Sequence, residues 1–150
     1  MPGTHSSLLF HIVFSTKRRY PMIHEGFEPE LYKYIVGIVS GENGHVLAIN
    51  GTSDHLHMVV RLKPKHSIPD LMRKIKANSS KWINEKRKID GRFGWQTGYG
   101  VFSVSESQLE KVISYVSNQK SHHRQKSFQE EFVGLLEKHN IGFDAEYLWD

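Results

Sequence analysis

The feature that most constrains this chain is a short run in which histidine alternates with apolar side chains. The run is Asp54–Val60, which reads Asp-His-Leu-His-Met-Val-Val. Because successive residues of a β-strand point to opposite faces of a sheet, His55 and His57 project side by side. Leu56, with the apolar residues two and four positions further on, forms the opposite face. This pattern predicts a strand that packs one face on helices and presents two imidazoles, a candidate metal site, on the other.

Composition limits what such a site can contain. The chain has 150 residues, which predicts one domain spanning residues 1–150 with a core of its own. It has no cysteine, so disulfides and thiolate metal sites are excluded and a metal must be held by His, Asp, Glu, Gln or water. The N-terminal residues lack a charged-then-apolar signal pattern, and no apolar run approaches the ~20 residues that span a bilayer. We therefore expect a cytoplasmic location.

Periodicity predicts the order strand, helix, strand, strand, helix, strand, followed by further helices. This order indicates an α+β fold of the ferredoxin-like, split βαβ type: an antiparallel sheet with helices on one face, plus a C-terminal helix. The His-Leu-His strand takes a central position in such a sheet. Ser105–Gln108 matches a capping box for a helix that runs to about Lys120. The expected earlier elements are Leu8–Phe14, Glu28–Ser40, His45–Asn50, the run Asp54–Val60 with Arg61 and Leu62, Ser67–Lys88 and Val101–Val104.

The helix after the fourth strand carries a tyrosine at the edge of its apolar stripe. Tyr115 projects about 100° from the centre of that stripe, and Gln119 and His122 follow along the same line. On geometry alone, a boundary tyrosine with a satisfied hydroxyl is the simpler interpretation. The alternative is a polar line of functional side chains beside the histidine strand.

Basic residues concentrate in a loop and on one helix face. A net charge of +4 has no meaning until the charges are placed, because an even scatter is only a soluble surface. The clusters are consistent with a solvated face or with phosphate binding. Trp95 and Tyr99 are likewise compatible with base stacking or with core packing. The basic candidates are Lys17, Arg18 and Arg19 in the loop and Arg73, Lys74, Lys76 and Lys81 on the helix.

Taken together, the motifs resemble the single-tyrosine HUH transposases of the smallest, IS200-like bacterial insertion sequences. Asp54–His57 and Tyr115–Gln119 carry the resemblance, and His11–Arg18 and Trp95–Val104 also match the family. The similarity extends from Leu8 to about residue 127. His-x-His alone is a weak signal, but its combination in this order with Tyr-x-x-x-Gln is specific.

The resemblance implies a mechanism and its residues. Tyr115 is expected to attack a phosphodiester of single-stranded DNA and to form a 5′-phosphotyrosine. His55, His57 and Gln119 are expected to hold one divalent metal, Mg²⁺ or Mn²⁺. Apart from the resemblance, His11 is a candidate for the same sheet face and His122 continues the line of Tyr115 and Gln119, so both are candidates for supporting these ligands, with ordinary packing as the alternative for His11. The family also implies hairpin DNA as substrate, bound by the basic residues above, and a homodimer whose subunits can share active sites.

Two other functions fit the same sequence. One is a domesticated relative that processes repeated chromosomal hairpins. The other is a non-catalytic nucleic-acid-binding module built on a ferredoxin-like sheet. The second predicts exposed aromatic side chains on the central strands, where this chain has His55 and His57, which counts against it.

Overall fold

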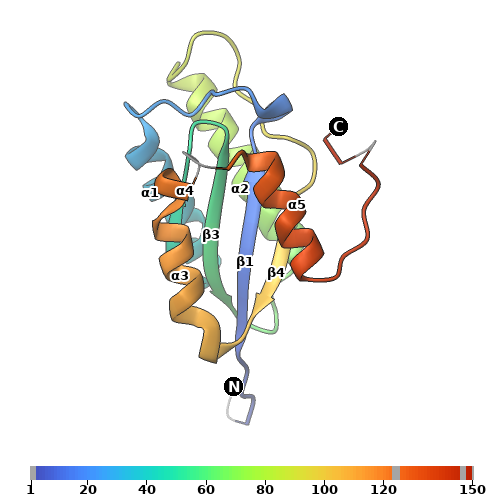
Figure 1. The fold of residues 1–150 in the computed structure, drawn as a ribbon. Helices are drawn as coiled ribbons and strands as arrows, with labels where there is room; N and C mark the ends of the chain where they lie inside the picture. The colour runs from blue at the N-terminus through green and yellow to red at the C-terminus, as the bar shows by residue number, and fades with distance from the viewer. Residues whose placement is uncertain (1–2, 123–125, 146–147, 150) are drawn as a thin grey trace.

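A computed structural model describes residues 3–122, 126–145 and 148–149 of the chain. Its four strands form one antiparallel sheet in the order β2-β3-β1-β4, so that β3 and β1 are central. This is the ferredoxin-like arrangement that the sequence predicts (Figure 1). The elements that build it are β1 (Leu8–Ser15), α1 (Glu28–Gly41), β2 (His45–Gly51), β3 (His55–Leu62), α2 (Ile68–Glu85) and β4 (Gly100–Val104).

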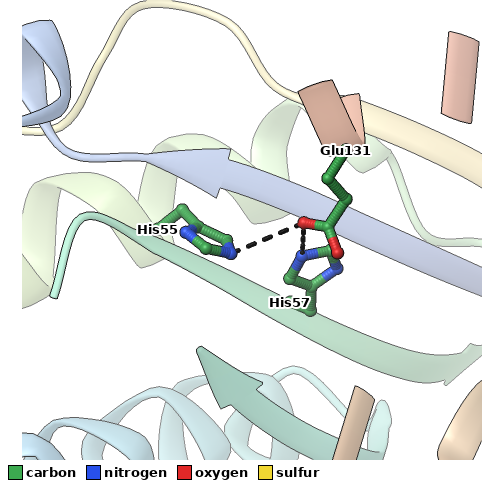
Figure 2. A group of neighbouring side chains, drawn as sticks. All are labelled: His55, His57 and Glu131. Atoms are coloured by element: carbon green, nitrogen blue, oxygen red, sulfur yellow. Dashed lines mark hydrogen bonds and ion pairs between the residues drawn. The ribbon is translucent and has the colours of Figure 1, made fainter. Parts of the chain in front are cut away.

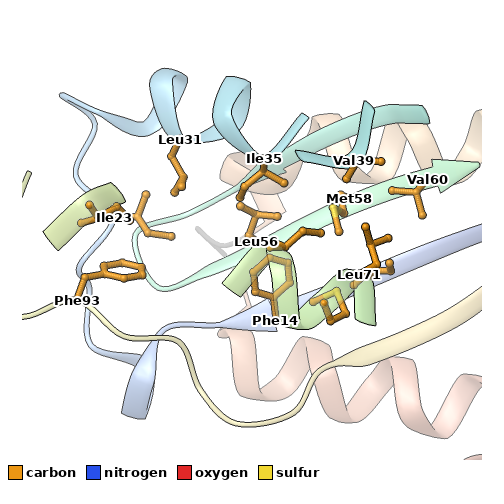
Figure 3. Close-up of a cluster of buried hydrophobic side chains, with 14 of the residues drawn as sticks. Phe14, Ile23, Leu31, Ile35, Val39, Leu56, Met58, Val60, Leu71 and Phe93 are labelled. Atoms are coloured by element: carbon orange, nitrogen blue, oxygen red, sulfur yellow. The ribbon is translucent and has the colours of Figure 1, made fainter. Parts of the chain in front are cut away.

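Helices α1 and α2 cover one face of the sheet and enclose the main hydrophobic core (Figure 3). The buried residues of α1 recur at spacings of four, so one stripe of the helix meets the sheet. Helix α2 begins at the predicted N-cap, where the Ser67 hydroxyl accepts from the Asp70 amide, and it ends three residues before the predicted Lys88. The sheet contributes the apolar sides of β1 and β3. The core includes Phe14, Leu31, Ile35, Val39, Leu56, Met58, Leu71 and Ile75.

The opposite face is covered by the helices that follow β4: α3 (Leu109–Ser117), α4 (Gln119–His122) and α5 (Phe128–Lys138). Figure 1 shows α3 and α5 on the same side of the sheet, with α3 toward β2 and β3 and α5 toward β1 and β4. Helices therefore lie on both faces of the sheet, whereas the prediction placed them on one face and added a C-terminal helix. Helices α3 and α5 flank the central strands on the second face. A smaller apolar cluster of Val13, Phe102, Phe128 and Leu136 fixes α5.

The region after β4 differs locally from the prediction. Ser105 does not form a capping box; its hydroxyl lies 3.1 Å from that of Ser107, and a 3₁₀ turn at Glu106–Gln108 precedes α3. A capping box does form at α5, where Ser127 and Glu130 satisfy each other's backbone amides. Helix α3 ends at Ser117 instead of continuing to Lys120.

The predicted basic loop follows β1 directly. The buried Thr16 fixes it, because its hydroxyl donates to the carbonyls of Tyr20 (2.6 Å) and Asp54 (3.1 Å). Arg18 and Arg19 adopt positive φ angles of 55° and 59°, so the chain turns sharply there. The loop thus lies beside the start of β3, where the histidine pair begins. In the part of the chain that the structure describes, no helix has the length and apolarity needed to cross a membrane.

Candidate active site

The two histidines of β3 lie on the same face of the sheet, as the strand pattern predicts, and they are fully buried between α3 and α5. His55 is oriented from behind: its Nδ1 lies 2.8 Å from Asp54 Oδ1 and 2.9 Å from the Thr52 hydroxyl oxygen. Because a carboxylate only accepts hydrogen bonds, Nδ1 carries the ring proton and donates it. The lone pair of Nε2 therefore points into the site, an arrangement typical of metal-binding histidines.

His57 is oriented by a third histidine. His11 lies on β1, on the same face of the sheet, and its Nε2 is 2.7 Å from Nδ1 of His57. Burial, together with the neighbouring His57 ring, lowers the pKa of His11 to about 3, so that His11 is neutral near pH 7. A neutral His11 can accept a proton from His57 Nδ1, which leaves His57 Nε2 as a ligand atom. The structure thus brings His11 into direct contact with His57, as a supporting role would require.

A carboxylate from α5 meets both histidines. Glu131 is buried, with 4% of its surface exposed, and its Oε1 lies 2.8 Å from His57 Nε2 and 3.5 Å from His55 Nε2 (Figure 2). Its other oxygen, Oε2, accepts from the Tyr115 hydroxyl and from the Gln119 amide nitrogen, the latter at 3.1 Å. Glu131 therefore links the histidine pair to the predicted nucleophile.

Tyr115 and Gln119 reach the histidines from separate helices. Asn118 interrupts the helix between them, and its side chain donates to the Ser114 carbonyl at 2.9 Å. The interruption turns Gln119 inward: it is fully buried, and its Oε1 lies 3.2 Å from His55 Nε2. The Tyr115 and His57 ring centroids are 5.9 Å apart within the same chain. His122 ends α4, but its side chain lies outside the described residues.

The donor set fits a divalent metal ion. Ligand atoms of His55, His57 and Glu131 lie within 4.8 Å of one another, and Gln119 Oε1 faces the same His55 nitrogen. Lone pairs of two imidazoles, a carboxylate and an amide oxygen thus converge in a buried space. Such an arrangement is unfavourable unless protons or a cation lie among them. Imidazole with oxygen ligands suits Mn²⁺, and oxygen ligands also suit Mg²⁺.

Glu131 is the residue that the sequence prediction missed, although further helices were predicted after the fourth strand. A signal for it exists in the spacing of α5. Glu131 follows Phe128 by three positions and precedes Leu135 by four, so it lies within the apolar stripe and not opposite it. A carboxylate in an apolar stripe is costly to bury without partners, which marks it as a candidate functional residue.

The surroundings of Tyr115 act on its hydroxyl. Burial and the adjacent Glu131 carboxylate raise the pKa of Tyr115 above its ordinary value, and the contact with Gln119 opposes this. The hydroxyl is therefore protonated near pH 7 in this arrangement. Positive charge brought close to the hydroxyl would favour the phenolate, which is the better nucleophile.

A cleft of about 840 Å³ opens beside Tyr115, between α3, α5 and β4. His11, Tyr115 and Glu131 line its inner end. Its other lining residues include three lysines that the sequence prediction did not single out: Lys111, Lys126 and Lys138. The cleft thus joins the candidate site to a positively charged surface.

The predicted basic residues of α2 do not lie near the histidine site. Helix α2 packs on the opposite face of the sheet from the histidines. Lys74 pairs with Glu42, and the Lys76 ammonium donates to the carbonyls of Gln96 (2.8 Å) and Gly98. Burial lowers the pKa of Lys76 to about 8. Arg73 and Lys81 lie on the exposed surface of that helix. The Arg73 guanidinium is 3.8 Å from the Asp70 carboxylate, and the Lys81 ammonium is 3.9 Å from the Glu85 carboxylate.

The basic loop and the aromatic residues near it differ in how far they are exposed. Lys17 and Arg18 are exposed, whereas Arg19 is half-buried with its guanidinium 5.0 Å from the centre of the Trp149 ring. Trp95 packs against the main core and donates to the Ser79 hydroxyl at 2.9 Å, which supports core packing for it. The exposed Lys17 and Arg18 are therefore the loop residues most accessible to a ligand.

The structure therefore has a ferredoxin-like sheet with a histidine pair on a central strand and a tyrosine-bearing helix beside it, the combination that the sequence motifs predict. The family model described as "Transposase IS200 like" matches residues 4–119. The chain belongs to the IS200-like transposase family, a family of DNA-cleaving enzymes.

Known relatives agree with this assignment. The ISDra2 transposase TnpA of Deinococcus radiodurans is 25% identical over 118 residues, which cover 75% of this chain and 84% of that protein. The transposase for insertion sequence element IS200 of Salmonella typhimurium is 27% identical over 115 residues, covering 73% of this chain and 75% of its own length.

Solved structures share the fold. A candidate transposase from Deinococcus radiodurans superposes with a TM-score of 0.64 at 22% identity, covering 79% of this chain and 95% of that one. A REP-associated tyrosine transposase, solved bound to a REP hairpin, superposes with a TM-score of 0.60 at 12% identity, covering 82% and 74%. At these identities the likeness supports the fold of the sheet and its helices.

Proposed function

We propose that this transposase cuts and rejoins single-stranded DNA at hairpin-bearing element ends through a 5′-phosphotyrosine on Tyr115. The observation that carries the proposal is the contact between the Tyr115 hydroxyl and the Glu131 carboxylate, which also contacts His57. A nucleophile beside a candidate metal site is the arrangement that phosphoryl transfer requires.

The proposed chemistry balances without a further co-reactant. The Tyr115 oxygen forms a bond to phosphorus as the bond from phosphorus to the 3′ oxygen breaks. The phenolic proton is lost and the departing 3′ oxygen gains one, which leaves a free 3′-hydroxyl. Rejoining is the reverse attack by a 3′-hydroxyl on the phosphotyrosine, so the phosphodiester energy is retained and no ATP is needed.

His55, His57 and Gln119 are proposed to hold one divalent metal, Mg²⁺ or Mn²⁺. When bound, the ion supplies positive charge to the phosphate oxygens as the transition state forms. Asp54 and His11 keep the two imidazoles directed at it. Gln119 serves both sides, because its oxygen faces His55 and its nitrogen donates to Glu131.

The DNA is proposed to approach from two directions. The strand to be cut enters the cleft lined by Lys111, Lys126 and Lys138, which leads to Tyr115. The hairpin contacts the basic loop of Lys17, Arg18 and Arg19, which lies beside the start of β3. Contacts from Arg73, Lys74, Lys76 and Lys81 of α2 remain a prediction. They require DNA that reaches around to the other face of the sheet.

The homodimer also remains a prediction. In this chain Tyr115 meets its own histidines, so each subunit can hold a complete site. Mixing Tyr115→Phe with His57→Ala tests this: complete sites stay inactive in the mixture, whereas shared sites regain activity. The comparisons favour neither the domesticated relative nor the non-catalytic module.

The experiment that tests the proposal uses single-stranded hairpin DNA labelled at both ends, with Mn²⁺ or Mg²⁺. We expect a covalent protein–DNA adduct that survives denaturation and is absent with Tyr115→Phe. Tyr34→Phe is the matched control. Tyr34 lies on α1, on the other side of the sheet, and its ring centroid is 5.1 Å from that of Trp82. An adduct that persists with Tyr115→Phe would show that another residue is the nucleophile.

A further inference from the structure

The buried Glu131 lies beyond the residues that match the family model, which end at residue 119. Its helix is nevertheless built to hold it in place. The capping box at Ser127 sets the start of α5, and Phe128 and Leu136 anchor the helix in an apolar cluster with β1 and β4. The capping box and this apolar packing thus place the Glu131 carboxylate beside the histidines.

The two carboxylate oxygens of Glu131 face different partners. Oε1 faces the Nε2 atoms of His57 and His55, at 2.8 and 3.5 Å, whereas Oε2 faces Tyr115 and Gln119. Because Asp54 holds the ring proton of His55 on Nδ1, the His55 Nε2 lone pair is directed toward Oε1. An anionic oxygen and imidazole lone pairs that converge in this way are arranged as ligands of one cation.

Charge distinguishes Glu131 from the other ligands. Two imidazoles and an amide form a neutral set, and Mg²⁺ and Mn²⁺ in proteins are usually bound through at least one carboxylate. The cluster of His55, His57 and Glu131, whose ligand atoms lie within 4.8 Å of one another, includes that carboxylate. A buried carboxylate in turn needs a positive partner, so the requirements of the ion and of Glu131 are complementary.

We propose that Glu131 is the anionic ligand of the metal and that the bound ion fastens α5 over the active site. This inference rests on the proposed function, in which His55 and His57 bind a metal. The ion then joins β3 to α5, two elements far apart in the sequence. Through its second oxygen, the same side chain keeps the Tyr115 hydroxyl next to the ion.

The test measures Mn²⁺ binding by titration calorimetry, without DNA, for the wild-type chain, Glu131→Gln, His57→Ala and Glu137→Gln. Glu137 is the matched control, since it lies on the same helix but is exposed. We expect Glu131→Gln to weaken Mn²⁺ binding by at least about tenfold, and Glu137→Gln to leave it unchanged. Circular dichroism checks that each variant is folded.

Hydrogen exchange provides a second measurement. It uses the wild-type chain alone, so its result does not depend on whether a variant folds. Addition of Mg²⁺ or Mn²⁺ should slow amide exchange in α5 and leave α1 unchanged. Unchanged exchange in α5 at saturating metal would overturn the proposal, as would wild-type affinity in Glu131→Gln when His57→Ala has lost it. If the wild-type chain binds no metal, the proposed metal centre itself fails, and this inference with it.

Discussion

The two faces of the sheet are built from alternate residues of the same strands, but one face has an apolar environment and the other a polar one. On the α1–α2 face, Leu56 and Met58 of β3 are buried among aliphatic and aromatic side chains. On the α3–α5 face, His55 and His57 of the same strand are equally buried but among polar partners. The α1–α2 face is held by apolar burial, whereas the α3–α5 face combines a smaller apolar cluster with the directed contacts of the histidines.

The comparison indicates where stability and function reside. Apolar burial contributes about 25 cal/mol per Å² whatever the partner, so the α1–α2 face stabilises the fold. Buried polar clusters contribute little net stability, and a missing partner is costly. The polar cluster on the α3–α5 face therefore adds little net stability, and its directed contacts serve the chemistry of the site. Substitutions on each face test this division.

The largest effect is expected from His57→Ala. Loss of a metal ligand should lower the DNA cleavage rate by about 1000-fold, because the charge on the phosphate is no longer offset. Hairpin binding should stay close to wild type, since it depends on basic residues. Gel assays of cleavage and of binding measure both, with His45→Ala on the exposed side of β2 as control. Joint loss of binding and cleavage would mean that the polar face is structural.

A core truncation should show the reverse pattern. Ile35→Ala removes a fully buried side chain of α1 and should lower the free energy of unfolding by about 3 kcal/mol, within the range for such truncations. Urea denaturation measures the loss, with the partly buried Ile38→Ala as the milder control. The folded variant should still cleave DNA at low temperature. Lost cleavage in a folded Ile35→Ala chain would show that the two faces are coupled.

The two faces were not equally predictable from sequence. Alternation along β3 is local, so it placed His55 and His57 on one side and the core residues on the other. The inward turn of Gln119 depends on the interruption at Asn118, which a helical projection does not contain. Glu131 depends on how α5 crosses the sheet. That direction is set by packing between elements that are distant in sequence. The apolar stripe of α5 shows which residues share a face, but it does not show which part of the sheet that face will contact.

Asp54→Asn should have an intermediate effect, because it perturbs His55 without removing a proposed ligand. An amide can offer its nitrogen to Nδ1, so the ring proton is no longer held on that atom. We expect Mn²⁺ affinity to fall by about 10- to 100-fold, as for other groups that orient metal-binding histidines. Calorimetry measures the change, with Asp90→Asn as the exposed control. Unaltered affinity would mean that packing alone orients the imidazole.

The smallest effect is expected for the double variant Lys111→Ala/Lys138→Ala in the cleft beside Tyr115. Each lost phosphate contact lowers the slope of log affinity against log salt by about 0.7 for single strands, so two lower it by about 1.4. A double variant on α2, Arg73→Ala/Lys81→Ala, removes the same charge from the other face. Fluorescence anisotropy with a hairpin-free strand should register the first variant and not the second. An equal change in slope for the two variants would mean that the DNA strand contacts both faces of the sheet. The division between a structural and a functional face would then hold for the protein interior alone.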